Sequence, residues 1–264
     1  MFRNLPPVTK NLLIINLLFF FSTIVFSRYG VNLTHLLGLH YITASDFHIW
    51  QPLTYMFMHA GFGHLFCNMF AVLMFGPAIE ERWGSQRFLI YYLITGLGAA
   101  VVQEAVWALQ LQSVLNSIDP LLSAKLANRV ITIGASGAVF GILMAFGWLF
   151  PDIRMYIMFI PIPIRARTLV IIYALIELLA GLAPISGDNV AHFAHLGGMI
   201  FGLALILWWR FRGYDGFESM SYGDSRLKQW IKQRWDQIRS KRPPRIKRDD
   251  DSKDYHDYHY HKPL

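Results

Sequence analysis

Long apolar stretches separated by short polar segments recur along the first 210 residues. Six of them approach or reach the roughly 17–25 residues of helix that a bilayer core requires. We expect these spans at residues 11–26, 63–79, 88–111, 131–150, 168–184 and 190–209. The pattern predicts an all-α membrane protein, with a six-helix bundle over residues 1–210.

Two apolar segments need separate treatment. The first run follows Arg3 and Lys10 in the manner of a signal peptide, but no small-residue cleavage site follows it. We therefore expect an uncleaved first helix. Residues 153–164 are also apolar, but this run is short and contains Pro161 and Pro163, so we expect an interfacial loop. The lone cysteine, Cys67, lies in an apolar run and is expected to be a small buried side chain.

Composition supports the membrane interpretation. Hydrophobic residues make up 54% of the chain and charged residues 16%, where soluble domains carry about 25% charged residues. Of the 24 Lys and Arg, 14 lie from Arg210 onward. These figures exclude a soluble single domain and a disordered chain. The net charge of +7 belongs to the tail, so we expect no nucleic-acid partner.

The basic residues also predict the orientation. With a cytoplasmic N-terminus, 21 Lys and Arg lie inside and 3 lie outside, so both termini are expected in the cytoplasm. Residues 211–243 are expected to form a basic amphipathic cytoplasmic segment, with a helix at 225–239 that suits the membrane surface. Docking of that helix on cytoplasmic loops is nearly as favoured. Residues 244–264 have almost no apolar content and are expected to be disordered, with four histidines that offer weak metal ligands at most.

Three expected spans carry polar side chains at one depth. Asn68, Ser136 and His195 all fall within roughly 5–12 Å of the outer boundary, at 1.5 Å per helical residue. A serine hydroxyl becomes nucleophilic when a histidine takes its proton. His64 and Asn68, at i and i+4, share a helix face and can donate to an oxyanion together with the backbone N–H of Ser136.

Other interpretations of these polar residues stay open at this level. A serine in a glycine-rich span usually serves packing, and a lone histidine often bonds a carbonyl. His192 and His195 could bind a metal, but no third ligand has a convincing spacing, and His192 is assigned a structural or rim role. Glu104 and Glu177 could mark an ion path, although interhelical hydrogen bonds are favoured for them.

Small residues predict a close helix contact. Gly137 and Gly141 form one small face, on the fourth span, and Gly198 and Gly202 form another, on the sixth. Such faces let membrane helices approach closely. Packing of the two faces on each other would bring Ser136 within reach of His195.

The chain resembles the rhomboid intramembrane serine proteases over about residues 45–210. The resemblance rests on four motifs in order: His59, His64 and Asn68; Glu80, Arg82 and Gly84; Gly134-Ala135-Ser136-Gly137; and Ala194-His195 followed by Gly198 and Gly202. It implies a rhomboid-like bundle and a Ser136–His195 dyad without an acidic third member. It also implies an oxyanion hole from His64, Asn68 and the Ser136 N–H, and structural roles for His59, Glu80 and Arg82.

The resemblance further implies cleavage of single-span membrane proteins near the outer end of their helix, within the lipid bilayer and without a cofactor or metal. Two positions depart from the family pattern. Phe140 stands where a tyrosine often packs on the catalytic histidine, and Trp50-Gln51 stands where Trp-Arg is common. The rivals are a non-proteolytic rhomboid-like protein that binds membrane clients and, further off, a six-helix transporter. The plain architecture predicts a multi-pass protein of the bacterial inner membrane.

Overall fold

The computed structural model of this protein describes residues 5–157, 160–183 and 190–214, together with positions 229, 232, 233 and 236. The chain divides into two compact units, Met1–Tyr222 and Gly223–Leu264. Within the second unit, only the four single positions are described, and each is helical. The expected helix at 225–239 therefore lies largely outside the described residues, and the expected disordered segment 244–264 lies wholly outside them.

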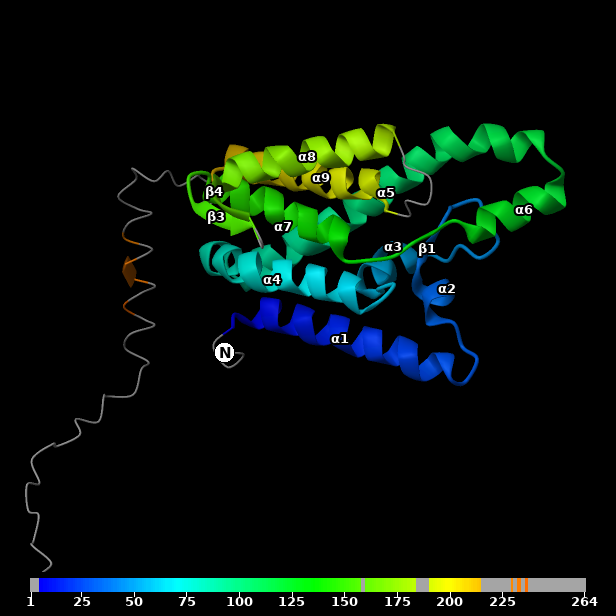
Figure 1. Ribbon diagram of the computed structural model, residues 1–264, viewed down its shortest axis with the longest axis horizontal. Helices are drawn as coiled ribbons and strands as arrows, with labels where there is room; N and C mark the ends of the chain where they lie inside the picture. Colours follow the sequence, from blue (N-terminus) through cyan, green and yellow to red (C-terminus); the bar gives the residue numbers. More distant parts are fainter. Residues whose placement is uncertain are drawn as a thin grey trace, which may run out of the picture. The chain divides into compact units, whose positions relative to one another are not determined.

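The first unit is built mainly from helices that run side by side (Figure 1). The elements, in chain order, are α1 (Pro7–Ser27), α2 (Leu33–Leu37), β1 (Leu39–His40), α3 (Gln51–Thr54), the 3-10 helix η2 (Tyr55–Phe57), α4 (Phe62–Trp83), α5 (Ser85–Ser117), α6 (Pro120–Arg129), β2 (Ile131–Thr132), α7 (Ser136–Leu149), β3 (Arg154–Ile157), β4 (Ile160–Arg165), α8 (Ala166–Leu182) and α9 (His192–Phe211).

Four of these helices are long and apolar enough to cross a membrane: α1, α4, α5 and α9. They cover the first, second, third and sixth expected spans. The other two expected spans are shorter helices, α7 with 14 residues and α8 with 17. The apolar run 131–150 is helical only from Ser136, because its first residues form strand β2 and Gly134 has a φ of +130°. At 1.5 Å per residue, α7 is about 21 Å long, which is less than a bilayer core.

The short helix α7 lies at the centre of the first unit. It contacts α4, α5, α8 and α9, and ten of its residues are buried. A helix that is apolar on every side belongs in the interior of a fold. Leu143 of α7 packs with Leu169 and Val170 of α8 and Met199 of α9 in one buried cluster. The first residue of α7, Ser136, is therefore held at the end of the most enclosed helix.

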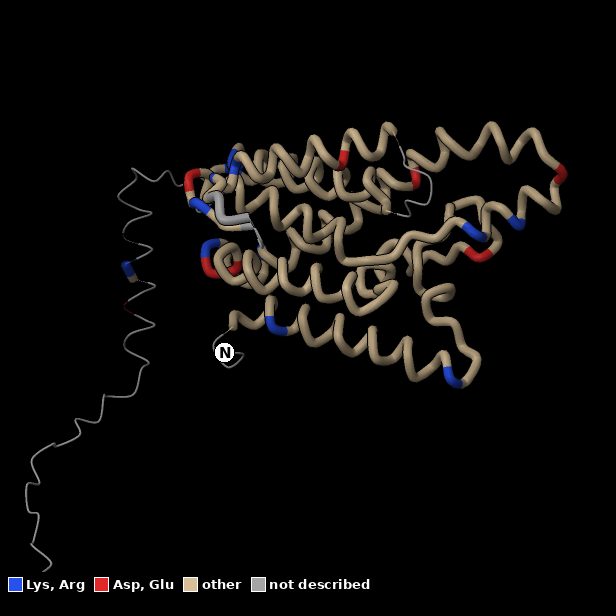
Figure 2. Tube along the Cα trace, in the orientation of Figure 1, with Lys and Arg blue, Asp and Glu red and all other residues tan. Residues whose placement is uncertain are grey.

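The outer faces of the long helices are apolar. Leu18, Val101 and Ile200 are 58–60% exposed, which suits contact with lipid rather than water. Charged residues gather mainly at the two ends of the first unit (Figure 2). Cys67 is exposed, so the expectation that it is buried was wrong. The helical period turns Leu65 and Asn68 of α4 inward and places Cys67 on the outer face.

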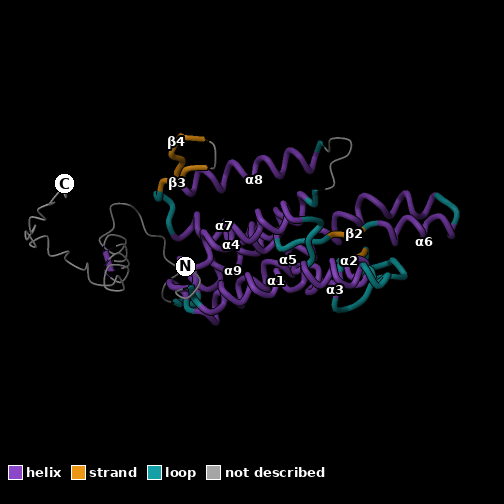
Figure 3. Tube along the Cα trace, turned by 60° about the horizontal axis from the view of Figure 1, so that its bottom comes forward, coloured by secondary structure: helices purple, strands orange, loops and turns teal. Residues whose placement is uncertain are grey.

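Two antiparallel strand pairs lie toward opposite ends of the first unit (Figure 3). In the first pair, Leu39 of β1 faces Thr132 of β2 just before α7. The second pair, β3 with β4, aligns Arg154 with Arg165. It falls in the apolar segment 153–164, which was expected to be a loop rather than a span. The short helices α2, α3 and α6 were not anticipated from the sequence.

Candidate active site

Ser136 and His195 meet where α7 and α9 begin. Ser136 is the first residue of α7, and His195 lies in the first turn of α9. The distance from Ser136 Oγ to His195 Nε2 is 2.7 Å. The imidazole of His195 is buried and stacks on Phe140 of α7, with ring centroids 4.3 Å apart and planes 8° apart. The stack and the hydrogen bond together set the position and the plane of the imidazole.

Glycine residues, which have no side chain, allow α7 and α9 to come this close. A Cβ atom built at Gly198 would collide with the backbone of Gly137, the residue after Ser136. The expected contact of α7 with α9 is thus present where Gly198 meets the Gly137 backbone, although a Cβ at Gly137 itself would meet Ala99 of α5 at 2.5 Å. It does not extend further along the helices. A Cβ at Gly141 would meet Thr95 at 2.6 Å, and one at Gly202 would collide with the Tyr91 hydroxyl. Both of these glycines therefore face α5, because α5 passes alongside α7 and α9 below the site.

A carboxylate from a third helix reaches the same histidine. Glu177 of α8 is buried, and its Oε2 lies 2.8 Å from His195 Nδ1 and 2.7 Å from His192 Nδ1. Sequence reasoning favoured an interhelical hydrogen bond for Glu177, and it bonds to α9, but its partner was not foreseen. The resemblance implied no acidic residue at this place. A carboxylate and two histidines near the facing ends of two successive expected spans were the only signal that the sequence offered.

The expected oxyanion donors border the serine from α4. The backbone N–H of Ala60 points to His64 Nδ1 at 3.4 Å, which leaves Nε2 to carry the proton of the neutral ring. A Cβ built at Gly134 would lie 2.8 Å from His64 Nε2 and 3.5 Å from Ser136 Oγ, so the two groups line one small space. Asn68 is 5% exposed, and its Nδ2 has no hydrogen-bond partner among the described residues.

The residues expected to be structural lie at the two ends of α4: His59 precedes the helix beside His64, and Glu80 and Arg82 lie in its last turn. The ring of His59 packs edge-on against that of His64, with centroids 5.0 Å apart. Burial, and to a lesser degree the neighbouring His64, lowers the pKa of His59 to about 4. Glu80 of α4 accepts hydrogen bonds from the backbone N–H groups of Val8 and Thr9 at 2.9 and 2.7 Å. It thereby caps the N-terminus of α1, where helices carry unpaired donors.

The turn after Glu80 requires a glycine. Gly84 joins α4 to α5 with a φ of +82°, a conformation that side chains disfavour. Ser85 donates to Glu80 Oε1 at 2.7 Å across this turn. Arg82 is in the last turn of α4, and its buried Nε has no partner among the described residues.

Gln51, which follows Trp50 where the family pattern commonly has an arginine, forms hydrogen bonds through its side chain with the backbone of His40, Leu36 and Asp46.

Two groups of described residues have the composition of a metal site. One consists of His35 in α2, His40 in β1 and Asp46 in the loop before α3, and the other of Glu177, His192 and His195. In each group, the candidate ligand atoms lie within 4.8 Å of one another. In the second group, the third candidate ligand is Glu177 of α8, which the sequence spacing of His192 and His195 did not reveal. Hydrogen bonds join Glu177 to both histidines.

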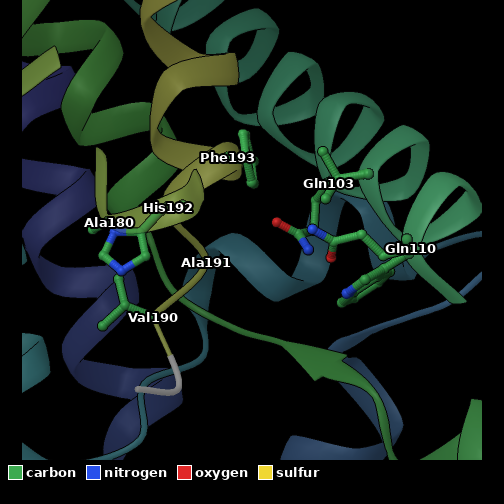
Figure 4. Close-up of a pocket in the computed structure, with 10 residues that line it drawn as sticks. Gln103, Gln110, Ala180, Val190, Ala191, His192 and Phe193 are labelled. Carbon is green, nitrogen blue, oxygen red and sulfur yellow. The ribbon is translucent and has the colours of Figure 1, made fainter. Parts of the chain in front are cut away.

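A small cavity adjoins the second group. It has a volume of about 200 Å³ and is lined by residues of α5, α8 and the start of α9. Figure 4 shows His192 on one side of it and Gln103 and Gln110 on the other. Pockets that hold drug-sized molecules measure about 300–1,000 Å³. This cavity is smaller, so it suits water better than a peptide segment.

Comparison with known proteins identifies the family. The family model described as Rhomboid domain matches residues 46–211, which include the serine, both histidines beside Glu177 and the residues from α4. The chain belongs to the rhomboid family. This rhomboid is 30% identical to RHOMBOID-like protein 6, mitochondrial, of Arabidopsis thaliana over 59% of the chain and 42% of that protein.

Two further relatives widen the comparison. This rhomboid is 31% identical to RHOMBOID-like protein 2 of Arabidopsis thaliana, over 68% of the chain and 48% of that protein. It is 27% identical to Rhomboid-like protease 3 of Toxoplasma gondii, over 73% of the chain and 65% of that protein. The chain thus spans less than half the length of the two plant relatives. These relatives are eukaryotic and do not support a bacterial inner membrane as its location.

Proposed function

We propose that this rhomboid is an intramembrane serine endopeptidase that hydrolyses a peptide bond of another membrane protein. The observation that carries the proposal is the 2.7 Å contact between Ser136 Oγ and His195 Nε2 at the buried start of α7. A serine that serves packing alone needs no imidazole beside its hydroxyl. General-base catalysis by histidine requires a heavy-atom distance of about 2.6–3.2 Å, which this contact meets.

The reaction follows the usual course of a serine hydrolase. His195 Nε2 takes the proton of Ser136 as Oγ attacks the carbonyl carbon of the scissile bond, and the carbonyl oxygen becomes an oxyanion. The imidazolium then gives this proton to the nitrogen of the leaving segment, the C–N bond breaks, and an ester remains on Ser136. A water molecule, deprotonated by the same imidazole, attacks the ester. The resulting tetrahedral intermediate then collapses: the bond from its carbon to Ser136 Oγ breaks, the imidazolium gives its proton to Oγ, and the new carboxyl terminus is released.

Three groups are proposed to stabilise the oxyanion. They are the side chains of His64 and Asn68 and the backbone N–H of Ser136. The Asn68 amide suits this role because it is buried without a partner among the described residues. An N–H group at a helix start has no intrahelical acceptor, so that of Ser136 can donate as well. Donors that are already in place do not have to reorganise when charge develops.

The membrane arrangement completes the proposal. In the proposed arrangement, α7 and α8 make two further crossings beside the four long helices, and the distribution of basic residues supports cytoplasmic termini. In this arrangement residues 1–210 form the membrane domain, residues 211–243 a basic cytoplasmic segment and residues 244–264 a disordered tail. Substrates are single-span proteins cut near the outer end of their helix. Cleavage requires extended backbone, which helix-destabilising residues and a small side chain at the cut favour.

The test is labelling of the purified full chain with a fluorophosphonate, together with cleavage of a single-span substrate in proteoliposomes. We expect Ser136 to be labelled, and we expect Ser136→Ala and His195→Ala to abolish both signals while the melting temperature stays near that of wild type. A non-proteolytic client-binding member, or a transporter that uses Glu104 and Glu177, would show neither labelling nor cleavage. Cleavage within about tenfold of wild type in either variant would exclude the pair as the catalytic centre.

A further inference from the structure

Glu177 is a buried carboxylate to which the proposed chemistry assigns no role. It projects from the outer half of α8 and accepts hydrogen bonds from two residues of α9 through one oxygen atom, Oε2. The side chains of Glu177 and His195 are each 10% exposed, and that of His192 is 13% exposed. A carboxylate in so enclosed a place is costly unless it is paired, so this position demands a physical reason.

The hydrogen bonds of His195 determine which of its ring nitrogens carries the proton. An ionised carboxylate only accepts hydrogen bonds, so the nitrogen that faces Glu177, Nδ1, carries a proton. In the neutral imidazole, the lone pair then belongs to Nε2, the atom that faces Ser136 Oγ at 2.7 Å. This is the tautomer that a general base for Ser136 requires. Without an acceptor at Nδ1, the ring is free to hold its proton on Nε2, and it cannot then take the serine proton.

We propose that Glu177 is a positioning residue that completes a Ser136–His195–Glu177 triad, and that His192 holds Glu177 in place for it. The inference rests on the proposed protease function. Glu177 selects the tautomer of His195 and stabilises the imidazolium that forms when the serine proton is transferred. The negative charge lies 2.8 Å from the nitrogen that shares the new positive charge, at a site where water screens little.

None of the other groups described around His195 can stabilise its imidazolium as Glu177 does. The ring is bordered by the Ser136 hydroxyl of α7, the Phe140 ring of the same helix and His192 one turn earlier on α9. His64 of α4 lines the same small space as Ser136 Oγ. None of these groups is an anion. Among the described residues, Glu177 is the acidic side chain that contacts this ring.

The experiment compares Glu177→Gln and Glu177→Ala with wild type in the substrate-cleavage assay. Glu177→Gln keeps the shape of the side chain and removes its charge. In soluble serine proteases, replacing the equivalent carboxylate by an amide lowers kcat about 10⁴-fold. We expect kcat to fall at least ~100-fold in both variants, and KM to stay within about threefold of wild type, because Glu177 touches no substrate. The rate of fluorophosphonate labelling of Ser136 should fall in parallel.

Glu104→Gln is the matched control. Glu104 is also a carboxylate on an expected span, and it accepts a hydrogen bond from the backbone of Ile42 at 2.9 Å rather than from a histidine. The control should keep wild-type kcat even if its melting temperature falls. A kcat of Glu177→Gln within about threefold of the control would overturn the triad. A raised KM at unchanged kcat would do the same, since it would mark a substrate contact.

Two further results separate the possible failures. If wild type shows no labelling and no cleavage, the proposed function fails, whereas labelled wild type with fully active Glu177 variants refutes the triad alone. Wild type should also be equally active with EDTA and without it. If EDTA raises the rate and Zn²⁺ lowers it in wild type but not in His192→Ala, the cluster of Glu177, His192 and His195 is an inhibitory metal site, and the positioning role is overturned.

Discussion

Single residues carry the site because each has a polar atom that the fold leaves available. Ser136 presents its hydroxyl to an imidazole, and Asn68 presents an amide without a partner among the described residues. A buried donor without a partner lowers stability by about 1–3 kcal/mol. In the proposed reaction, the same unpaired donor stabilises the oxyanion that forms beside Ser136. At Asn68, a local loss of stability is thus linked to the proposed chemistry.

The first prediction at this scale concerns Asn68→Ala. If the Asn68 amide binds the oxyanion, its removal should lower kcat by roughly 10²–10³, the usual effect of losing one such donor. The melting temperature should stay near that of wild type, because Asn68 Nδ2 has no hydrogen-bond partner among the described residues. Cleavage rates in proteoliposomes and thermal unfolding in detergent measure the two effects.

Asn16→Ala provides the control for Asn68. Asn16 is a buried asparagine of α1, and its Nδ2 donates to the Leu12 carbonyl at 2.7 Å, far from Ser136 along the fold. Its replacement should lower the melting temperature and leave kcat unchanged. Wild-type kcat in Asn68→Ala would remove this residue from the proposed oxyanion hole.

Pairs of helices set the distances within the site. The α7–α9 contact is closest at Gly137 and Gly198, one residue after Ser136 and three after His195. Below this point, Gly141 and Gly202 accommodate Thr95 and Tyr91 of α5, and the Tyr91 hydroxyl donates to the Gly141 carbonyl at 2.8 Å. The bundle near the site is therefore a three-helix contact of α5, α7 and α9 rather than a single pair.

A prediction at the scale of elements follows from the closest of these contacts. Gly198→Ala should push α9 away from α7, because the new methyl group would collide with the Gly137 backbone. A shift near 1 Å at a catalytic pair lowers the rate about 100-fold. We expect such a loss in kcat together with a lower melting temperature.

Gly63→Ala makes the same change where a Cβ atom meets nothing within 4 Å, so activity and stability should both be kept. If Gly198→Ala keeps wild-type kcat and melting temperature, the α7–α9 contact is not required for activity or stability.

The whole molecule responds to pH through histidines outside the long spans. His59 has a pKa of about 4 in the fold, mainly because it is buried, and burial also lowers the pKa of His40. In the unfolded chain both titrate near 6.5. Below that pH the unfolded chain binds protons that the folded protein does not, so the free energy of unfolding falls as the pH falls.

This prediction is checked by the melting temperature in detergent between about pH 7.5 and 4.5. His59 alone accounts for a loss of about 3 kcal/mol in the free energy of unfolding between its two pKa values, since one pKa unit corresponds to about 1.4 kcal/mol. His59→Phe removes this titration and should show a shallower decline than wild type. An equal decline in both proteins would assign the pH dependence to other groups.

Properties that depend on a single stretch of chain could be predicted from the sequence alone. The length of an apolar run predicted α1, α4, α5 and α9, because crossing hydrocarbon is a requirement that each helix meets by itself. The motif order predicted the family, which the match to residues 46–211 shows. Depth along separate spans predicted that Ser136 and His195 could meet, since residues the same distance from a membrane boundary lie in one layer.

Only the tertiary structure decided which faces meet. A helix such as α7, apolar all round, has no periodicity that reveals its rotation, so the sequence could not show that Gly137 and Gly141 both turn toward α5 while Gly198 of α9 meets the Gly137 backbone. The start of α7 at Ser136 depends on the pairing of β2 with β1, some ninety residues earlier in the chain. The contact of Glu177 with His195 requires α8 to lie against α9 with one orientation, and this is a property of the packed bundle rather than of any segment within it.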